Sequence, residues 1–371
     1  MLKILQIGDV HLDSGLDYLN EEKREARNKQ IEHTFIRIID LALEERINIL
    51  LVTGDLFENN RPSKRAIDLV NKQFQRLLQA QIKIVILPGN QDCWGEKSVY
   101  RKIKQETGIY LFTQPTWEYL IISEFSINFY GYASVEGQDY SERVLPKLSK
   151  VKKTGLQIGL FHGSLEGSSQ QIDNYYPFSL EELENSGLDY WALGHYHRCL
   201  IKEEGVKAGY GGSPEGLSFQ ELGESYVLLL QIEDGKITTI ERKRVDSHQL
   251  KLLVIECQDY TRPEEIFKMI MEESQSNLLL RVILKGVICH KLDLEELREG
   301  LLEKFFYLEI QDNTTKYTEC PENNQDLTVK RYFVELMTAR IKGSQDEKEK
   351  KKLQLALSLG IEALMGGERG C

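Results

Sequence analysis

In the first 200 residues, five apolar runs each end in a side chain that can bind a metal ion. The runs are LQIG, LLVTG, VILPG, QIGLF and DYWALG, and the polar residues that follow them are Asp9, Asp55, Asn90, His162 and His195. Amphipathic helical stretches separate the first three runs, which is typical of an α/β fold. Because the carboxyl ends of strands in such sheets meet in one crevice, we expect the five side chains to converge.

Two of these residues have a histidine two positions further on, so that Asp9 is paired with His11 and His195 with His197. In an extended backbone, residues i and i+2 point the same way, and each pair is expected to direct two ligands to one point. Each residue alone is more often a turn or packing residue, but five strand ends in this order are hard to explain by turns. Two carboxylates, four imidazoles and one amide are too many for one ion and suit two ions that share a bridging carboxylate.

Composition limits the possible partners and the compartment. The net charge of −11 excludes a bulk nucleic-acid binder, so any contact with DNA needs a local basic surface, bound cations or a basic partner. No apolar run is long enough for a membrane span, and MLKILQIGDVHL lacks a signal-peptide cleavage region. The six cysteines are scattered, which indicates reduced thiols. We therefore expect a cytoplasmic protein with no membrane contact.

The order of strands and helices predicts three parts in this chain. Residues 1–247 are expected to form two packed β-sheets with helices outside them. In 248–320 the pattern strand, helix, strand, helix, strand predicts a smaller α+β cap domain. The segment CPENNQD (320–326) is expected to be a linker, and the rest of 321–371 is expected to hold C-terminal helices at 327–341 and 349–365.

The motifs GDVH, GDLFE, GNQD, FHGS and GHYH resemble those of calcineurin-like metallophosphoesterases. The resemblance is closest to the SbcD-type DNA-repair exonucleases, including the YhaO-like branch. GDLFENNRPS and GSPEGLSFQELGE resemble that nuclease branch rather than small-molecule phosphodiesterases. The resemblance implies a four-layer αββα sandwich, two manganese-type ions and a metal-dependent nuclease that hydrolyses phosphodiester bonds in DNA repair.

The resemblance also implies which side chains hold which ion. The ligands of the first ion would be Asp9, His11 and His197. Those of the second ion would be Asn90, His162 and His195. Asp55 would bridge both ions. Oxygen and imidazole ligands suit Mn²⁺.

Gln91 departs from the family pattern. In the resembled family a histidine directly follows the metal-binding asparagine, in the pattern GNHD, and gives a proton to the leaving oxygen. Glutamine donates a hydrogen bond but no proton near neutral pH, and general acid catalysis is worth a factor of about 10² to 10⁴. The chain is therefore expected to be a slowed or inactive homologue, a variant altered to silence catalysis, or an enzyme with another proton donor.

The sequence also suggests residues that contact DNA and a protein partner. Four basic residues near the motifs are candidates for phosphate contacts, against the alternative of ordinary solvated charges: Arg61, Lys64, Arg65 and Arg198. In the resembled family a C-terminal helical region docks on an SbcC-like coiled-coil ATPase, and the protein is a homodimer. Two other functions stay open: a small-nucleotide phosphodiesterase, and a catalytically weak subunit that recognises DNA ends or regulates an ATPase.

Overall fold

The computed structural model divides the chain into two compact units, Met1–Lys251 and Leu252–Cys371, and each is described by itself. The predicted boundaries after residues 247 and 320 stay predictions, and the predicted linker at 320–326 lies outside the described residues. The structure describes residues 1–145, 148, 154–168, 173–257, 260, 262–288, 292–316, 329–346, 348–350, 352–353, 356–357 and 359–360.

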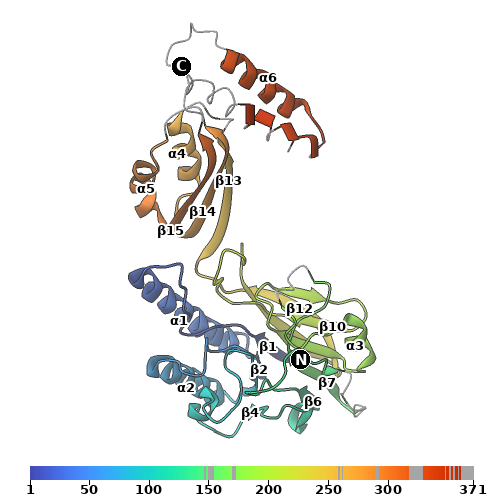
Figure 1. Ribbon diagram of the computed structural model, residues 1–371. Helices are drawn as coiled ribbons and strands as arrows, with labels where there is room; N and C mark the ends of the chain where they lie inside the picture. The colour runs from blue at the N-terminus through green and yellow to red at the C-terminus, as the bar shows by residue number, and fades with distance from the viewer. Residues whose placement is uncertain are drawn as a thin grey trace. The chain divides into compact units, whose positions relative to one another are not determined.

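The first unit contains two six-stranded sheets (Figure 1). The strands of the first sheet are β1 (Leu2–Ile7), β2 (Ile49–Thr53), β3 (Lys83–Leu87), β4 (Ile109–Leu111), β11 (Tyr226–Glu233) and β12 (Lys236–Arg244). Their order is β12-β11-β1-β2-β3-β4. Strands β1 to β4 are parallel, whereas β11 and β12 extend one edge as antiparallel strands.

The second sheet has the same plan of parallel strands with antiparallel edges. Its strands are β5 (Glu118–Ile122), β6 (Ile127–Gly131), β7 (Leu156–His162), β8 (Tyr190–Gly194), β9 (Leu200–Lys202) and β10 (Lys207–Tyr210). Their order is β5-β6-β7-β8-β10-β9. Strands β6, β7, β8 and β10 are parallel, and β5 and β9 pair antiparallel at the two edges.

The two sheets pack face to face through apolar side chains that alternate along the strands. Residues of both sheets share one buried cluster, which includes Ile4, Leu51, Val85, Ile158, Leu160 and Ala192. Their sequence neighbours point to the opposite faces, since side chains alternate across a strand. On the second sheet, Phe161 and Trp191 bury Leu183 of α3 (Leu180–Asn185) in this way.

Two longer helices cover the outer face of the first sheet (Figure 1). They are α1 (Glu21–Glu44) and α2 (Lys64–Gln79). The Asn20 and Ser63 side chains cap their first turns, and the Phe35 and Phe74 rings meet edge to face at 6.4 Å. With α3 on the second sheet, the layers are helix, sheet, sheet, helix, and the predicted αββα sandwich is confirmed.

The second unit combines a three-stranded sheet with helices, as the α+β pattern predicts. The sheet order is β13-β14-β15, and β14 is parallel to β15. The elements are β13 (Gln249–Glu256), α4 (Pro263–Glu272), β14 (Gln275–Ile288), α5 (Leu294–Leu301), β15 (Phe305–Lys316) and α6 (Val329–Gly343). Short 3₁₀ helices are η1 (Val99–Lys102) and η2 (Ser123–Phe125) in the first unit and η5 (Leu302–Lys304) in the second. Within the described residues, no helix is both long and apolar enough for a membrane span.

A buried ion pair joins α1 to the GSPEGL segment of the first unit. Nη1 of Arg27 donates to Glu215 at 2.8 Å, and both side chains are within 1% of full burial. Nη2 of Arg27 donates to the Gly216 carbonyl at 2.7 Å. The other oxygen of Glu215 accepts from Thr34 Oγ1 at 2.6 Å and from the Ser247 amide at 2.5 Å. The carboxylate therefore has partners on both oxygens, and it ties Ser247 to α1.

Replacement of Glu215 by glutamine is expected to lower the free energy of unfolding by about 3 to 5 kcal/mol, because it leaves the Arg27 charge buried and uncompensated. Urea denaturation measures this change. Glu224→Gln is the matched control, since Glu224 pairs with Arg244 while both side chains stay nearly half-exposed, and a loss under about 1 kcal/mol is expected there. Equal losses in the two variants would contradict the structural role of the buried pair.

Candidate metal centre

Glycine precedes four of the five strand-end residues, and neighbouring residues approach the backbone closely at these glycines. They are Gly8, Gly54, Gly89 and Gly194. A Cβ atom at Gly194 would lie 1.8 Å from the Thr53 carbonyl oxygen, and one at Gly89 would lie 2.2 Å from Oδ1 of Asp55. Neither position has room for a methyl group. Close packing therefore requires glycine before Asn90 and before His195, whatever turn the backbone forms there.

Buried hydrogen bonds tie the two sheets together next to these glycines. Thr53 at the end of β2 donates from Oγ1 to the Leu193 carbonyl of β8 at 3.2 Å. Gln6 of β1 donates to the Gly209 carbonyl of β10 at 2.7 Å and accepts from the Tyr190 hydroxyl at 2.6 Å. The strand ends of both sheets are thereby held in a fixed relation.

The predicted ligands converge at these strand ends. Oδ1 of Asn90 lies 2.8 Å from Nε2 of His162 and 3.2 Å from Nδ1 of His195. Oδ2 of Asp55 lies 3.4 Å from Nε2 of His162 and 3.8 Å from Nε2 of His11. Asp55 therefore stands between two groups of imidazoles.

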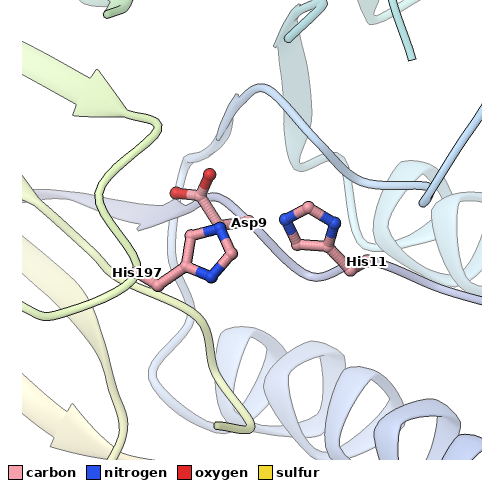
Figure 2. A group of neighbouring side chains, drawn as sticks. All are labelled: Asp9, His11 and His197. Carbon is pink, nitrogen blue, oxygen red and sulfur yellow. The ribbon is translucent and has the colours of Figure 1, made fainter. Parts of the chain in front are cut away.

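Donor atoms gather in two overlapping groups, in each of which they lie within 4.8 Å of one another. Asp9, His11 and His197 form one group, and Figure 2 shows their side chains facing a common space. Asp9, Asp55 and His162 form the other. Together with the contacts of Asn90, these groups bring all seven predicted ligands to one region of the first unit.

Each of the four imidazoles has one ring nitrogen held by an acceptor outside this centre. The pairs are His11 Nδ1 with Glu58 at 2.9 Å, His197 Nδ1 with Glu221 at 3.1 Å, His162 Nδ1 with the Thr53 carbonyl at 2.9 Å, and His195 Nε2 with Asp173 at 2.9 Å. A neutral imidazole that donates through one nitrogen carries a lone pair on the other, as a metal ligand must. Nε2 of His11 is buried and has no hydrogen-bond partner within the described residues, so this donor set fits a cation.

The electrostatics of the centre also fit a cation. Burial lowers the pKa of His162, but the Asp55 carboxylate outweighs it and raises the pKa to about 9. Burial likewise lowers the pKa of His197, and its hydrogen bond to Glu221 outweighs it, so that pKa also rises to about 9. Burial raises the pKa of Asp9. The carboxylates thus draw positive charge into the centre, and a divalent cation would replace these protons.

The backbone of the ligands corrects one expectation. Asp9, His11, Asp55 and His195 have φ angles of 50°, 51°, 49° and 97°, in the left-handed region rather than in extended conformation. The expected extended backbone is therefore wrong, although Asp9 and His11 still direct ligand atoms to one group. His195 and His197 lie in different groups, with His195 beside Asn90 and His197 beside Asp9. Strained backbone of this kind persists only where surrounding contacts fix it, and the His195 amide donates to Oδ1 of Asp9 at 3.0 Å.

A cavity of about 650 Å³ opens onto the centre. Gln91 and Arg198 line it, together with His11, Asp55, Asn90, His195 and His197. Arg61, Lys64 and Arg65 are not among its lining residues, and Arg65 forms an ion pair with Glu32. Arg198 is the only lysine or arginine among the described residues that line the cavity.

Four acidic residues near the centre were missed by the sequence analysis. Glu58, Glu221 and Asp173 hold imidazoles, and Asp92 ties two ligand loops together. The buried Asp92 carboxylate accepts from the Leu56 amide at 2.8 Å, the Gly89 amide at 2.9 Å and the Tyr100 hydroxyl at 2.6 Å. Glu58, Asp92 and Glu221 lie inside the motifs GDLFE, GNQD and GSPEGLSFQELGE, so these motifs could have indicated their role at the site. Asp173 lies in none of the motifs.

Gly194→Ala is expected to lower the free energy of unfolding by about 3 kcal/mol, because the new methyl group must push β8 away from Thr53. The same displacement should weaken the binding of a divalent cation, which isothermal titration calorimetry with Mn²⁺ as the probe measures. Gly211→Ala is the control, since a Cβ there meets neighbours only at 3.7 Å or more. A Gly194→Ala protein with unchanged stability and unchanged Mn²⁺ affinity would show that the sheets do not need this close approach.

Comparisons with known proteins agree with this geometry. The model of the calcineurin-like phosphoesterase family matches residues 2–199. Metallophosphoesterase YhaO of Bacillus subtilis, itself described as uncharacterized, is 28% identical over 320 residues, which cover 82% of this chain and 76% of that protein. DNA double-strand break repair protein Mre11 of Sulfurisphaera tokodaii is 26% identical over 97% of both chains. Mre11 of Methanopyrus kandleri is 25% identical over 60% of this chain and 50% of that protein. Since the family model covers more than half of the chain, the protein belongs to the calcineurin-like phosphoesterases, a family of metal-dependent hydrolases.

Proposed function

We propose that this protein is a two-metal-dependent DNA nuclease whose rate is lowered by Gln91. The observation that carries the proposal is the arrangement of four imidazoles, each held by an outer acceptor on one nitrogen, around Asp9, Asp55 and Asn90. Such a set of oxygen and nitrogen donors suits Mn²⁺. Cys93 and Cys199 have no place in it.

The seven ligands divide between two ions in this proposal. Asp9, His11 and His197 would hold the first ion, as their mutual approach within 4.8 Å supports. Asn90, His162 and His195 would hold the second, as their contacts of 2.8 and 3.2 Å support. Asp55 would serve both ions, since its Oδ2 lies 3.8 Å from Nε2 of His11 and 3.4 Å from Nε2 of His162.

The ions would supply the Lewis acidity that activates water and neutralises phosphate charge. The chain's own residues orient the Asp55 carboxylate and the phosphate of the substrate. The backbone amide of Gln91 donates to Oδ1 of Asp55 at 2.8 Å, which leaves Oδ2 of Asp55 directed at the imidazoles. Arg198 on the cavity wall offers a guanidinium to a phosphate oxygen.

Relatives support DNA as the substrate. Proteins named for DNA double-strand break repair match this chain, one of them over 97% of both lengths, so the likeness extends beyond the phosphoesterase domain. Arg61, Lys64 and Arg65 are proposed to contact the DNA backbone outside the cavity. Bound cations would offset the acidic net charge of −11 locally.

Gln91 accounts for the proposed slow rate. Its side chain is exposed and lines the cavity beside Asn90 and Asp55. A primary amide there can hydrogen-bond to a leaving oxygen but cannot protonate it. This same feature favours the second candidate function, a subunit that binds DNA ends and has little catalytic activity of its own.

Gln91→His is expected to raise Mn²⁺-dependent DNA hydrolysis at least about tenfold, because it restores a proton donor at the cavity wall. Cleavage of labelled duplex and single-stranded DNA measures the rate, with a generic phosphodiester reporter assayed in parallel. Gln220→His is the matched control, since Gln220 is also exposed and lines the same cavity.

The assay separates the candidate functions. DNA cleavage that rises in Gln91→His alone supports the nuclease. Turnover of the reporter without DNA cleavage indicates a small-nucleotide phosphodiesterase, and DNA binding without turnover in either protein indicates the end-binding subunit. An unchanged rate in Gln91→His places the acid elsewhere.

We further propose that the C-terminal region binds an SbcC-like coiled-coil ATPase. In α6, the exposed Val329, Tyr332 and Leu336 are available to a partner, while Met337 packs with Leu357. Truncation after Pro321 is expected to abolish co-purification with that ATPase. The Mn²⁺ content of the protein should stay unchanged, because every proposed ligand precedes residue 198. Retention of the ATPase by the truncated chain would assign α6 a purely structural role.

A further inference from the structure

His195 is held from two directions by residues outside the seven ligands. Oδ1 of Asp173 lies 2.9 Å from Nε2 of His195. The ring of Tyr175 stacks on the His195 imidazole, with centroids 5.1 Å apart and planes inclined by 25°. One residue therefore fixes the edge of the imidazole, and the other fixes its face.

Both of these residues are themselves fixed. Oδ1 of Asp173 also accepts from the buried Ser164 hydroxyl at 2.9 Å and from the Tyr175 amide at 3.2 Å. The Tyr175 hydroxyl donates to Oγ of the buried Ser134 at 2.8 Å. The carboxylate is thus anchored to the end of β7, although its own side chain is 53% exposed to solvent.

The orientation of His195 differs from that of the other three imidazoles. His11, His162 and His197 bind their outer acceptors through Nδ1 and direct Nε2 at the centre. His195 binds its acceptor through Nε2 and directs Nδ1 at Asn90, 3.2 Å away. Because a carboxylate only accepts, Asp173 places the hydrogen of the neutral ring on Nε2 and the lone pair on Nδ1.

The Asp9, His11 and His197 group has its own outer carboxylates, and Asp173 is not one of them. Glu58 holds His11, and Glu221 holds His197. Oε2 of Glu221 also accepts from the Leu217 amide at 2.9 Å, so this support comes from a different loop. Loss of Asp173 would leave these contacts in place.

We propose that Asp173 is the positioning residue for His195 and that it supports the second ion selectively. This inference rests on the two-ion assignment proposed above. Removal of the carboxylate frees the His195 ring edge and leaves the tautomer unspecified. Outer partners of metal-bound histidines are typically worth a factor of about 10 to 100 in affinity.

The test is the Mn²⁺ stoichiometry and affinity of Asp173→Ala and Asp173→Asn in the full chain. Equilibrium dialysis counts the bound ions, and electron paramagnetic resonance distinguishes a coupled pair of ions from a single one. We expect two ions in the wild type. In Asp173→Ala the second ion should bind about 10 to 100 times more weakly while the first keeps its affinity. Asp173→Asn, which retains an acceptor, should lose less.

Asp139→Ala is the control, because Asp139 is exposed and its carboxylate accepts only from Ser141 within the described residues. Two ions of unchanged affinity in Asp173→Ala would overturn the inference and leave the two-ion assignment standing. Equal weakening of both ions would also overturn it, since it would mean a general distortion of the centre. A wild-type chain that binds fewer than two ions would overturn the assignment and the inference together.

Discussion

The close contact between the two sheets at their strand ends determines the rest of the site. Gly194 of β8 meets the Thr53 carbonyl of β2 with no room for a side chain. The same carbonyl accepts from Nδ1 of His162, so one backbone group sets both the sheet spacing and an imidazole orientation. Residues at the strand ends of two separate sheets therefore approach within hydrogen-bond distance, as Asn90 and His162 do. Any change that separates the sheets also disperses the donor atoms.

This contact concentrates charge and strain that a hydrophobic interior would not tolerate alone. Asp9 and Asp55 are almost completely buried, and four ligand residues have left-handed backbone. Left-handed backbone of this kind costs about 1 to 3 kcal/mol per residue and persists when neighbouring contacts fix it. Here the fixing contacts are hydrogen bonds from backbone amides to carboxylates, as in His195 to Asp9 and Gln91 to Asp55. A cation that binds the carboxylates would add electrostatic stabilisation to the same geometry.

Sequence patterns predicted that the ligands would converge, because the strand ends of parallel sheets meet at one edge whatever their side chains are. The apolar runs before Asp9, Asp55 and Asn90 are parallel neighbours in one sheet, as expected from the alternation of strands and helices. The local backbone could not be predicted in this way, since the residues with left-handed φ angles are held by contacts with loops far away in the sequence, such as the His195 amide with Asp9. Asp173 was also beyond reach, because it follows no apolar run in the sequence and its role depends on contacts with Ser164 and His195, which are nine and 22 residues away.

The two ion sites proposed here differ in their outer support, and this difference follows from the fold. Glu58 and Glu221 belong to segments on which other buried groups depend: Glu58 directly follows the loop that Asp92 organises, and Glu221 holds the Leu217 amide. Asp173 is half-exposed and anchored chiefly by one hydroxyl and one amide. The outer carboxylates follow the same asymmetry. Glu58 and Glu221 hold both imidazoles of the first group, whereas in the second group Asp173 holds His195 and a backbone carbonyl, that of Thr53, holds His162. A cation should therefore be held more weakly beside Asn90, on the side of the centre where Gln91 reaches the cavity.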